Sequence, residues 1–331
     1  MDKIIQPANP VIGVGYGKTA TLDLAIGPRY HAVHFEVLAT AASGLFLAGE
    51  LSLDCLISMI NVKINGKVQR AHSLKELNAI QRSYDSRNAL NSWEYATSVR
   101  TWAQTLPAPY LPVVGAVSTA SMIQFSIYFA EPWRKSYAAT EAMAWPTAWQ
   151  DGSVLRSFQI ELVIPALNAT YILAGSSITI NAYVETDDYV GSLDANKQPI
   201  ALINKWKRYQ VPYTTTGDVP IVTLERRHIC EQISIFQGVR TDTISRVVVK
   251  KDDKTIRDVT RERNDQILIA RGFNPNGLTQ DRFDVVFDYS DLPTDGLVLE
   301  GARSFVVTPT LSVAAAANYM TLISQIYGPI D

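Results

Sequence analysis

The sequence predicts a mainly β protein made of two tandem antiparallel jelly-roll sandwiches, a double jelly roll, each with one short helix. Apolar and polar residues alternate with period two in many segments, as in half-buried strands. No strand–helix–strand rhythm typical of a parallel sheet occurs, and a hairpin followed by a helix occurs twice. The 331 residues, 47% of them hydrophobic, fit two globular domains and exclude a mainly disordered chain.

The strands are predicted where the alternation is most regular. Ile123, Phe125, Ile127 and Phe129 alternate with polar residues, and the same period occurs in 158–164, 178–184 and 283–289. Further strands are predicted at 20–26, 31–39, 55–64, 219–224, 229–237, 244–251, 305–312 and 316–326.

Two helices are predicted from their end signals. Ser73 and Glu76 form a capping box that opens a helix ending near Arg82. Thr260 can cap a second helix, which Gly272 closes.

Two segments of the chain look like copies of one unit. Residues 57–70 and 244–257 share six identities in 14 positions without a gap. Asn65-Gly66 suits a type I′ hairpin turn, and Asp252-Asp253 takes the same place in the second copy. The basic residues of this repeated hairpin are Lys63, Lys67, Arg70, Lys250, Lys254 and Arg257. A duplication therefore explains the sequence better than chance similarity of two hairpins.

Four regions are expected along the chain. Residues 1–19 form an N-terminal arm, 20–186 the first jelly roll, 187–218 a linker and 219–331 the second jelly roll. The linker is placed by its turn residues, which include Gly191, Pro199 and Gly217.

Charge and cysteine content exclude several classes of protein. Thirty Lys and Arg against 32 Asp and Glu leave a net charge of −2, so no specific nucleic-acid partner is expected. Cys55 and Cys230 are too few for a disulfide framework and are predicted to be two separate buried thiols. No secretory signal is visible, and the uncharged stretches 101–130 and 304–330 contain too much Pro or polar sequence for a membrane helix.

Nucleotide and metal sites are poorly supported. Residues 13–19 resemble a phosphate-binding loop, but Ile12 stands where its first glycine is required. The four histidines (31, 34, 72 and 228) lack metal-ligand spacing. Asp187-Asp188 and Asp252-Asp253 could bind Ca²⁺ but are more typical of solvated turns.

Catalytic residues are equally hard to assign. Glu161 and Glu185 could act as the carboxylates of a glycosidase, yet a glutamate on a strand is more often a surface residue. No catalytic residue, cofactor or metal ligand is therefore predicted.

Aromatic residues concentrate in two long insertions, 86–118 and 132–155. Long loops are uncommon unless they are functional or packed. Three interpretations stay open: subunit contacts, a sugar-binding platform, or simple covering of the sandwich ends. The candidate subunit-contact residues are Trp93, Trp102, Trp133, Trp145 and Trp149.

The sequence resembles a known family over roughly residues 20–85. Ile26-Gly-Pro-Arg29 before a strand, the hairpin around Asn65-Gly66-Lys67, Arg70 and the helix start at Ser73 are similar to the double jelly-roll major capsid proteins of tailless icosahedral phages with an internal membrane. The corticovirus and finnlakevirus types are most similar. Beyond residue 85 the resemblance is architectural only.

This resemblance implies a structural protein of the virion shell, made in the host cytoplasm. It implies a homotrimer whose six jelly rolls form a pseudo-hexagonal capsomer of an icosahedral capsid. The implied partners are other copies of the chain, neighbouring capsomers, vertex and minor capsid proteins, and the viral membrane at the base. The alternatives are a receptor- or carbohydrate-binding virion spike and, less favoured, a glycoside-active enzyme.

Overall fold

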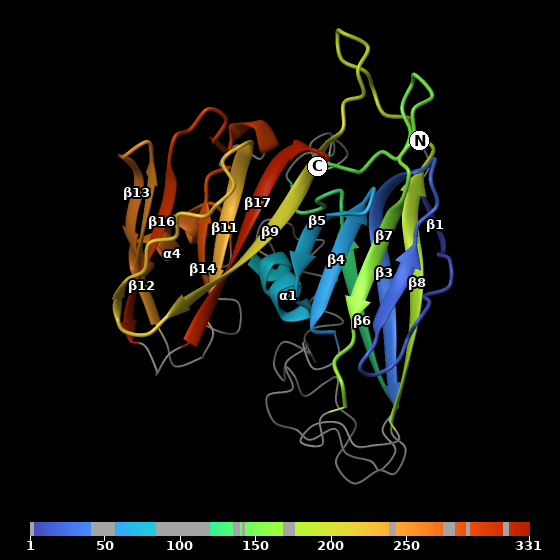
Figure 1. The fold of residues 1–331 in the computed structure, drawn as a ribbon, viewed down its shortest axis with the longest axis horizontal. Helices are drawn as coiled ribbons and strands as arrows, with labels where there is room; N and C mark the ends of the chain where they lie inside the picture. Colours follow the sequence, from blue (N-terminus) through green and yellow to red (C-terminus); the bar gives the residue numbers. More distant parts are fainter. Residues whose placement is uncertain are drawn as a thin grey trace.

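The computed structural model describes residues 3–40, 57–83, 120–134, 140, 143–167, 176–237, 243–273, 282–288, 292–313 and 318–331. Two antiparallel β-sandwiches lie side by side (Figure 1), and one sheet of nine strands runs through both. Within the described ranges no helix has the length and apolar character needed to cross a membrane.

The first sandwich packs two four-stranded layers face to face. One layer has the order β1 (Ile4–Pro7), β8 (Ser177–Asp187), β3 (Arg29–Thr40) and β6 (Ala120–Tyr128). The facing layer has the order β5 (Lys67–His72), β4 (Met59–Ile64), β7 (Phe158–Val163) and β2 (Thr19–Asp23). Side chains along β4 and β7 alternate between buried and half-buried, as the sequence pattern predicts. Helix α1 (Leu74–Ser83) follows β5.

The second sandwich repeats this arrangement. One layer has the order β9 (Leu202–Tyr213), β17 (Asn318–Pro329), β11 (Ile229–Phe236) and β14 (Arg282–Val286). The other has the order β13 (Lys254–Thr260), β12 (Thr243–Lys251), β16 (Phe305–Val313) and β10 (Gly217–Asp218). Helix α4 (Arg261–Ala270) follows β13, and a 3₁₀ helix, η3 (Pro293–Asp295), leads into the short β15 (Leu297–Val298), which pairs with β11.

The two sandwiches correspond strand for strand in chain order. Strands β1 to β6 occupy the sheet positions of β9 to β14, while β7 and β8 occupy those of β16 and β17. Each copy also carries a bulge at the start of its third strand, between Tyr30 and Ala32 in β3 and between Cys230 and Gln232 in β11. This correspondence confirms the predicted double jelly roll and the duplication.

The repeated hairpin is confirmed in detail. Asn65 and Asp252 have φ angles of 51° and 50°, and the residues that follow them have 80° and 63°. These positive values are typical of a type I′ turn. Asp adopts a positive φ at a higher energetic cost than Gly does. Asn65 Oδ1 accepts hydrogen bonds from the backbone N–H of residues 156 and 157, and Asp252 Oδ1 accepts the same pair from residues 303 and 304.

Both predicted helix starts are present. The Ser73 hydroxyl accepts a hydrogen bond from the Glu76 N–H at 3.1 Å, while the Glu76 carboxylate accepts one from the Ser73 N–H at 2.7 Å. Thr260 Oγ1 accepts from the Arg263 N–H at 3.4 Å. Gly272, with φ of 81°, closes α4 as predicted.

The expected region boundaries need correction. Strand β1 lies within the supposed arm 1–19 and pairs with β8, and β9 lies within the supposed linker 187–218. Both strands were missed because their apolar and polar residues do not alternate: all of β1 is exposed, and β9 buries Asn204 and Lys205. Of the strand predicted at 219–224, only a single bridge at Ile221 is present.

The structure describes one of the two cysteines. Cys230 is a free, buried thiol whose pKa burial raises to about 12, as expected for a structural side chain. Cys55 lies outside the described residues.

Candidate functional site at the junction of the two sandwiches

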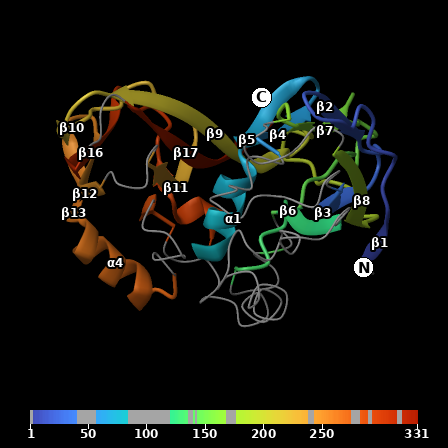
Figure 2. The ribbon, with the colours of Figure 1, turned by 90° about the horizontal axis from the view of Figure 1, so that it is seen from below.

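The two sandwiches meet where β5 of the first lies beside β9 of the second (Figure 2). The pairing is parallel, with Arg70 opposite Trp206, and it is the one parallel contact between named strands in the described part of the chain. It joins one layer of each sandwich into the nine-stranded sheet. The relative position of the two units is therefore partly set by backbone pairing.

Arg70 fixes this contact from the hairpin side. Its Nε donates to the Asn204 carbonyl at 2.9 Å, and its NH1 donates to the Tyr128 carbonyl at 2.6 Å, so one guanidinium binds both sandwiches. Burial lowers the pKa of Arg70 to about 10, against the opposing effect of Glu131 and Glu231, so it stays charged at neutral pH.

Aromatic rings surround the same guanidinium. Its carbon lies 4.9 Å from the Trp145 ring centre, 5.2 Å from Trp206 and 5.4 Å from Phe129. Contacts of this kind stabilise a desolvated cation. Arg70 therefore has favourable electrostatic partners although it is almost fully inaccessible to water.

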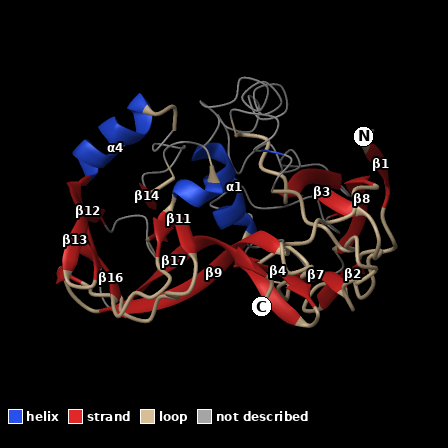
Figure 3. Ribbon diagram, turned by 90° about the horizontal axis from the view of Figure 1, so that it is seen from above, coloured by secondary structure: helices blue, strands red, loops and turns tan. Residues whose placement is uncertain are grey.

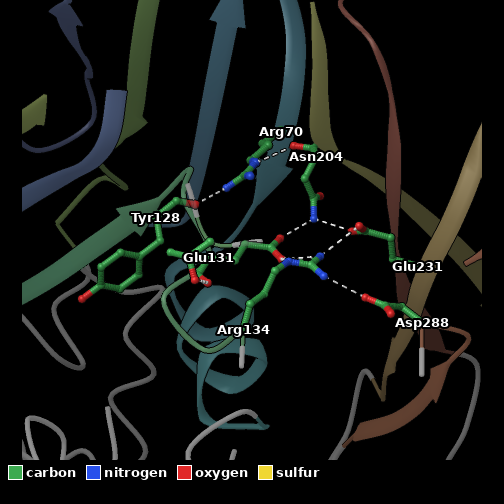
Figure 4. A network of polar contacts seen from close by, with 8 residues as sticks. Arg70, Tyr128, Glu131, Arg134, Asn204, Glu231 and Asp288 are labelled. Carbon is green, nitrogen blue, oxygen red and sulfur yellow. Dashed lines mark hydrogen bonds and ion pairs between the residues drawn. The ribbon is translucent and has the colours of Figure 1, made fainter. Parts of the chain in front are cut away.

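A buried charge cluster of five residues lies next to Arg70 (Figure 4): Glu131, Arg134, Asn204, Glu231 and Asp288. Arg134 donates to all three carboxylates, at 2.8 Å to Glu131, 3.1 Å to Glu231 and 2.9 Å to Asp288. The Asn204 amide donates to Glu131 at 2.5 Å and to Glu231 at 2.6 Å. Glu131 and Arg134 follow β6 of the first sandwich, and the other three belong to the second, so the cluster spans the junction.

The cluster holds more acidic than basic groups. Burial and the neighbouring Glu131 raise the pKa of Glu231 well above its usual range, against the opposing effect of Arg134. Proton uptake at Glu231 therefore occurs at a higher pH than in a solvated glutamate.

Helix α1 completes the junction by lying between the two sandwiches (Figure 3). Its Glu76 pairs with Arg208 of β9 at 3.1 Å, and its Ala79 carbonyl accepts a hydrogen bond from Arg282 of β14. The buried Leu77 and Ile80 of α1 share one apolar cluster with side chains of the second sandwich, namely Phe236, Leu268, Phe273, Val286 and Ile323. The polar and apolar contacts of α1 thus stabilise the same relative position of the two sandwiches.

The basic residues of the repeated hairpin differ between the copies. Arg70 is buried in the junction, while Arg257 is half-buried, with its guanidinium 5.7 Å from the Phe287 ring. Lys63 pairs with Glu161 at 2.5 Å. The remaining three, Lys67, Lys250 and Lys254, are exposed.

The subunit-contact prediction is wrong for three tryptophans. Trp133, Trp145 and Trp149 are buried within the chain, so they have almost no surface left for another subunit. Trp145 stacks on Phe158, and the Trp149 indole N–H donates to the Ile200 carbonyl at 3.0 Å. The described part of their insertion packs within the chain, against the first sandwich at Phe158 and against the second sandwich through Arg134. Trp93 and Trp102 lie outside the described residues.

The glycine-rich segment 13–19 is a turn that leads into β2. The Gly17 N–H donates to the Pro165 carbonyl and the Lys18 N–H to the Gly15 carbonyl. These backbone donors are therefore engaged within the protein.

Asp187 is an ion-pair partner within the first sandwich. Arg29 and His31 contact its carboxylate at 2.5 Å and 2.8 Å. Burial alone would raise the pKa of Asp187, but these partners and the Tyr189 N–H outweigh it and lower the value to about 2.

One further acidic and histidine group lies near the C-terminal end. Glu225, His228 and Asp331 bring one potential ligand atom each within 4.8 Å of the others. Lys205 and Lys207 both contact the Asp331 carboxylate, at 2.8 Å and 2.5 Å, which disfavours a cation there.

Sequence reasoning missed the buried charge cluster. A weak signal is present, because Glu231 and Gln232 interrupt the apolar pattern of 229–237. Polar residues in a strand that faces a second domain give such an interruption.

Two sequence-family profiles match the chain. Residues 5–93 match the family described as Viral coat protein P2 N-terminal domain, and residues 203–327 match Viral coat protein P2 C-terminal domain. Together they span more than half of the chain. Among curated proteins no sequence matches.

Solved structures give the same fold. The major capsid protein P2 from Bacteriophage PM2 is 13% identical, with a TM-score of 0.67 over 100% of this chain and 98% of that one. The STIV major capsid protein is 12% identical, with a TM-score of 0.68 over 99% and 97%. A PBCV-1 virus capsid chain is 9% identical, with a TM-score of 0.60 over 98% and 93%.

Proposed function

The chain belongs to the viral coat protein P2 family and is a major capsid protein of a virion shell, and from this we propose that three copies form one pseudo-hexagonal capsomer. Such capsomers would tile an icosahedral shell that encloses a membrane. The resemblance at residues 20–85 to capsid proteins of membrane-containing phages supports the icosahedral lattice and the membrane as a partner.

One observation carries the proposal: the two sandwiches are equivalent strand for strand and are joined through a built interface. Three such chains supply six similar units, which approximate a hexagon although the symmetry is three-fold. A head-to-tail contact forms a closed ring when its rotation closes. Half of the contacts between neighbouring sandwiches in such a ring lie within a chain, because each chain already joins two sandwiches.

We propose further that the protein has no catalytic activity. The two glutamates considered for glycoside chemistry are engaged in ion pairs, Glu161 with Lys63 at 2.5 Å and Glu185 with Lys3 at 3.3 Å. Neighbouring capsomers, vertex and minor capsid proteins, and the membrane surface at the base would be its partners. Its function would then depend on shape and broad protein contacts.

Native mass spectrometry of the purified chain tests the assembly. A species of three times the chain mass of 36.6 kDa is expected at micromolar concentration. Electron microscopy of the same sample should show hexagonal particles. A stable monomer at that concentration, or a monomer that binds glycans, would contradict the proposal.

A further inference from the structure

We propose that the junction within the chain is repeated between chains, with β13 and α4 of one copy docking on the β1 edge of the next. The inference rests on the proposed trimer and specifies which surfaces of neighbouring chains contact each other. Within the chain, β5 and α1 dock on β9 (Figure 2). In the duplicated fold β13 and α4 correspond to β5 and α1, and β1 corresponds to β9.

The two edges concerned are the ends of their layers. Strand β1 pairs with β8 and ends the order β1-β8-β3-β6, and β13 pairs with β12 and ends the order β10-β16-β12-β13. Among the described strands neither has a second neighbour. Open sheet edges are sites where another chain can add. The equivalent edges β9 and β5 are closed by each other.

The pairing registers identify the residues that would meet. Ile4 and Ile5 lie opposite Thr186 and Glu185, and these correspond through the shared bulge to Ile326 and Gln325 of β17. Lys205 and Trp206 lie opposite Ile326 and Gln325. Ile5 therefore corresponds to Trp206, the residue opposite Arg70. Because Arg257 corresponds to Arg70, Ile5 of one copy should lie opposite Arg257 of the next.

Burial differs sharply between the two sets of positions. Gln69 and Trp206 of the internal junction are 0% and 1% exposed. Their counterparts Ile256 and Ile5 are 37% and 67% exposed, and both are large apolar residues. Ile4, next along β1, is 45% exposed. Exposed apolar side chains that gather on sheet edges typically mark an interface.

Arg257 is already held like its internal counterpart. Its guanidinium lies 5.7 Å from Phe287, as that of Arg70 lies 5.4 Å from Phe129. Phe287 and Phe129 are themselves equivalent, since each donates its N–H to the bulge residue of the neighbouring strand, Glu231 or His31. The side chain is thus oriented on its own sandwich before any partner binds.

Helix α4 would cover the neighbouring sandwich as α1 does. It carries Ile269, which is 58% exposed and so offers a further apolar contact. Its Arg263 takes the place of Glu76 after the helix cap. The charge at this one position is therefore reversed relative to α1, so the contact made there between chains would differ from the one within the chain.

The first experiment places a charge on β1 of the full-length protein. Ile5→Arg sets a second guanidinium against Arg257 and should weaken trimer formation by at least about tenfold in native mass spectrometry over a dilution series. Ile5→Asp removes the same apolar side chain but can pair with Arg257, so it should weaken the trimer less. Ile12→Arg is the matched control, because Ile12 has the same exposure of 67% and lies outside β1. All three variants should unfold at the wild-type temperature as monomers.

The second experiment tests proximity directly. The double variant Ile5→Cys, Arg257→Cys should form disulfide-linked dimers and trimers on oxidation, because residues paired across adjacent strands lie close enough for a disulfide. Each single variant is a control for the natural cysteines. Mixing the two single variants should give linked dimers only.

The outcomes separate this inference from the proposed function. A monomeric wild type would overturn the trimer itself. A trimeric wild type that tolerates Ile5→Arg as well as Ile12→Arg, and that shows no link between positions 5 and 257, would overturn the inference alone. The trimer would then use other edges.

Discussion

Replacing Arg134 with leucine should strongly destabilise the protein at neutral pH. Arg134 makes hydrogen bonds with three buried carboxylates at the junction, at 2.8, 3.1 and 2.9 Å. Removal of one partner from a buried ion pair typically costs about 3–5 kcal/mol, since the remaining charge is left in a poorly solvated place. Three carboxylates lose a partner here, so we expect the upper part of that range.

The cost should depend on pH. In the variant the carboxyl of Glu231, whose pKa burial and Glu131 already raise, loses the opposing effect of Arg134, so its folded-state pKa should rise further above that of the unfolded chain. A carboxyl with a raised folded pKa destabilises the fold increasingly as the pH rises above its unfolded value near 4. The difference from wild type should therefore be smaller at pH 5 than at pH 8.

Urea unfolding followed by tryptophan fluorescence measures both effects, at one protein concentration because association adds to apparent stability. Arg246→Leu is the control, because Arg246 forms a solvent-exposed ion pair with Asp258 that water screens. It should cost far less at every pH. If Arg134→Leu cost no more than the control, or cost the same at pH 5 and pH 8, the reasoning about the cluster would be refuted.

Three further predictions concern groups described above. Glu231→Gln should flatten the loss of stability that wild type shows as the pH rises through the raised pKa of Glu231; an unchanged pH profile of urea unfolding would contradict this. Asp187, with a pKa of about 2 against 3.8 in the unfolded chain, contributes stability that should be lost as the pH falls from about 4 to 2, and Asp187→Asn should remove this acid dependence. Gly66→Ala should cost about 1 kcal/mol because φ there is 80°, whereas Asp253→Gly, at φ 63°, should add up to about 1 kcal/mol. Thermal unfolding of these two variants should shift in opposite directions, and a shift in the same direction would argue against a conformational origin.

Much of the fold could be predicted from local patterns. The alternation in 158–164 and 178–184 gives strands that bury one face, and Ser73 with Glu76 gives a helix start, because each signal depends on nearby residues alone. The duplication could be predicted because residues 57–70 and 244–257 keep six identities at one spacing and each hairpin leads into a helix.

The junction could not be predicted in the same way. Asn204 and Lys205 look like surface residues in the sequence, yet both are buried, since Asn204 joins the charge cluster and Lys205 pairs with Asp331. In the sequence, Trp145 looks like an exposed residue for a subunit contact. In the structure its ring lies against the guanidinium of Arg70, which belongs to the distant β4–β5 hairpin. Burial at such positions depends on which parts of the fold contact each other. The alternation of residues within one strand does not encode that contact.

The shared nine-stranded sheet has a mechanical consequence. Bending one sandwich against the other would break backbone hydrogen bonds and separate buried charges, so each chain should behave as a stiff plate. A closed shell, however, must curve. In a lattice of such plates the curvature would therefore arise at the seams between capsomers, and shells of different radius could be built from the same chain without refolding it.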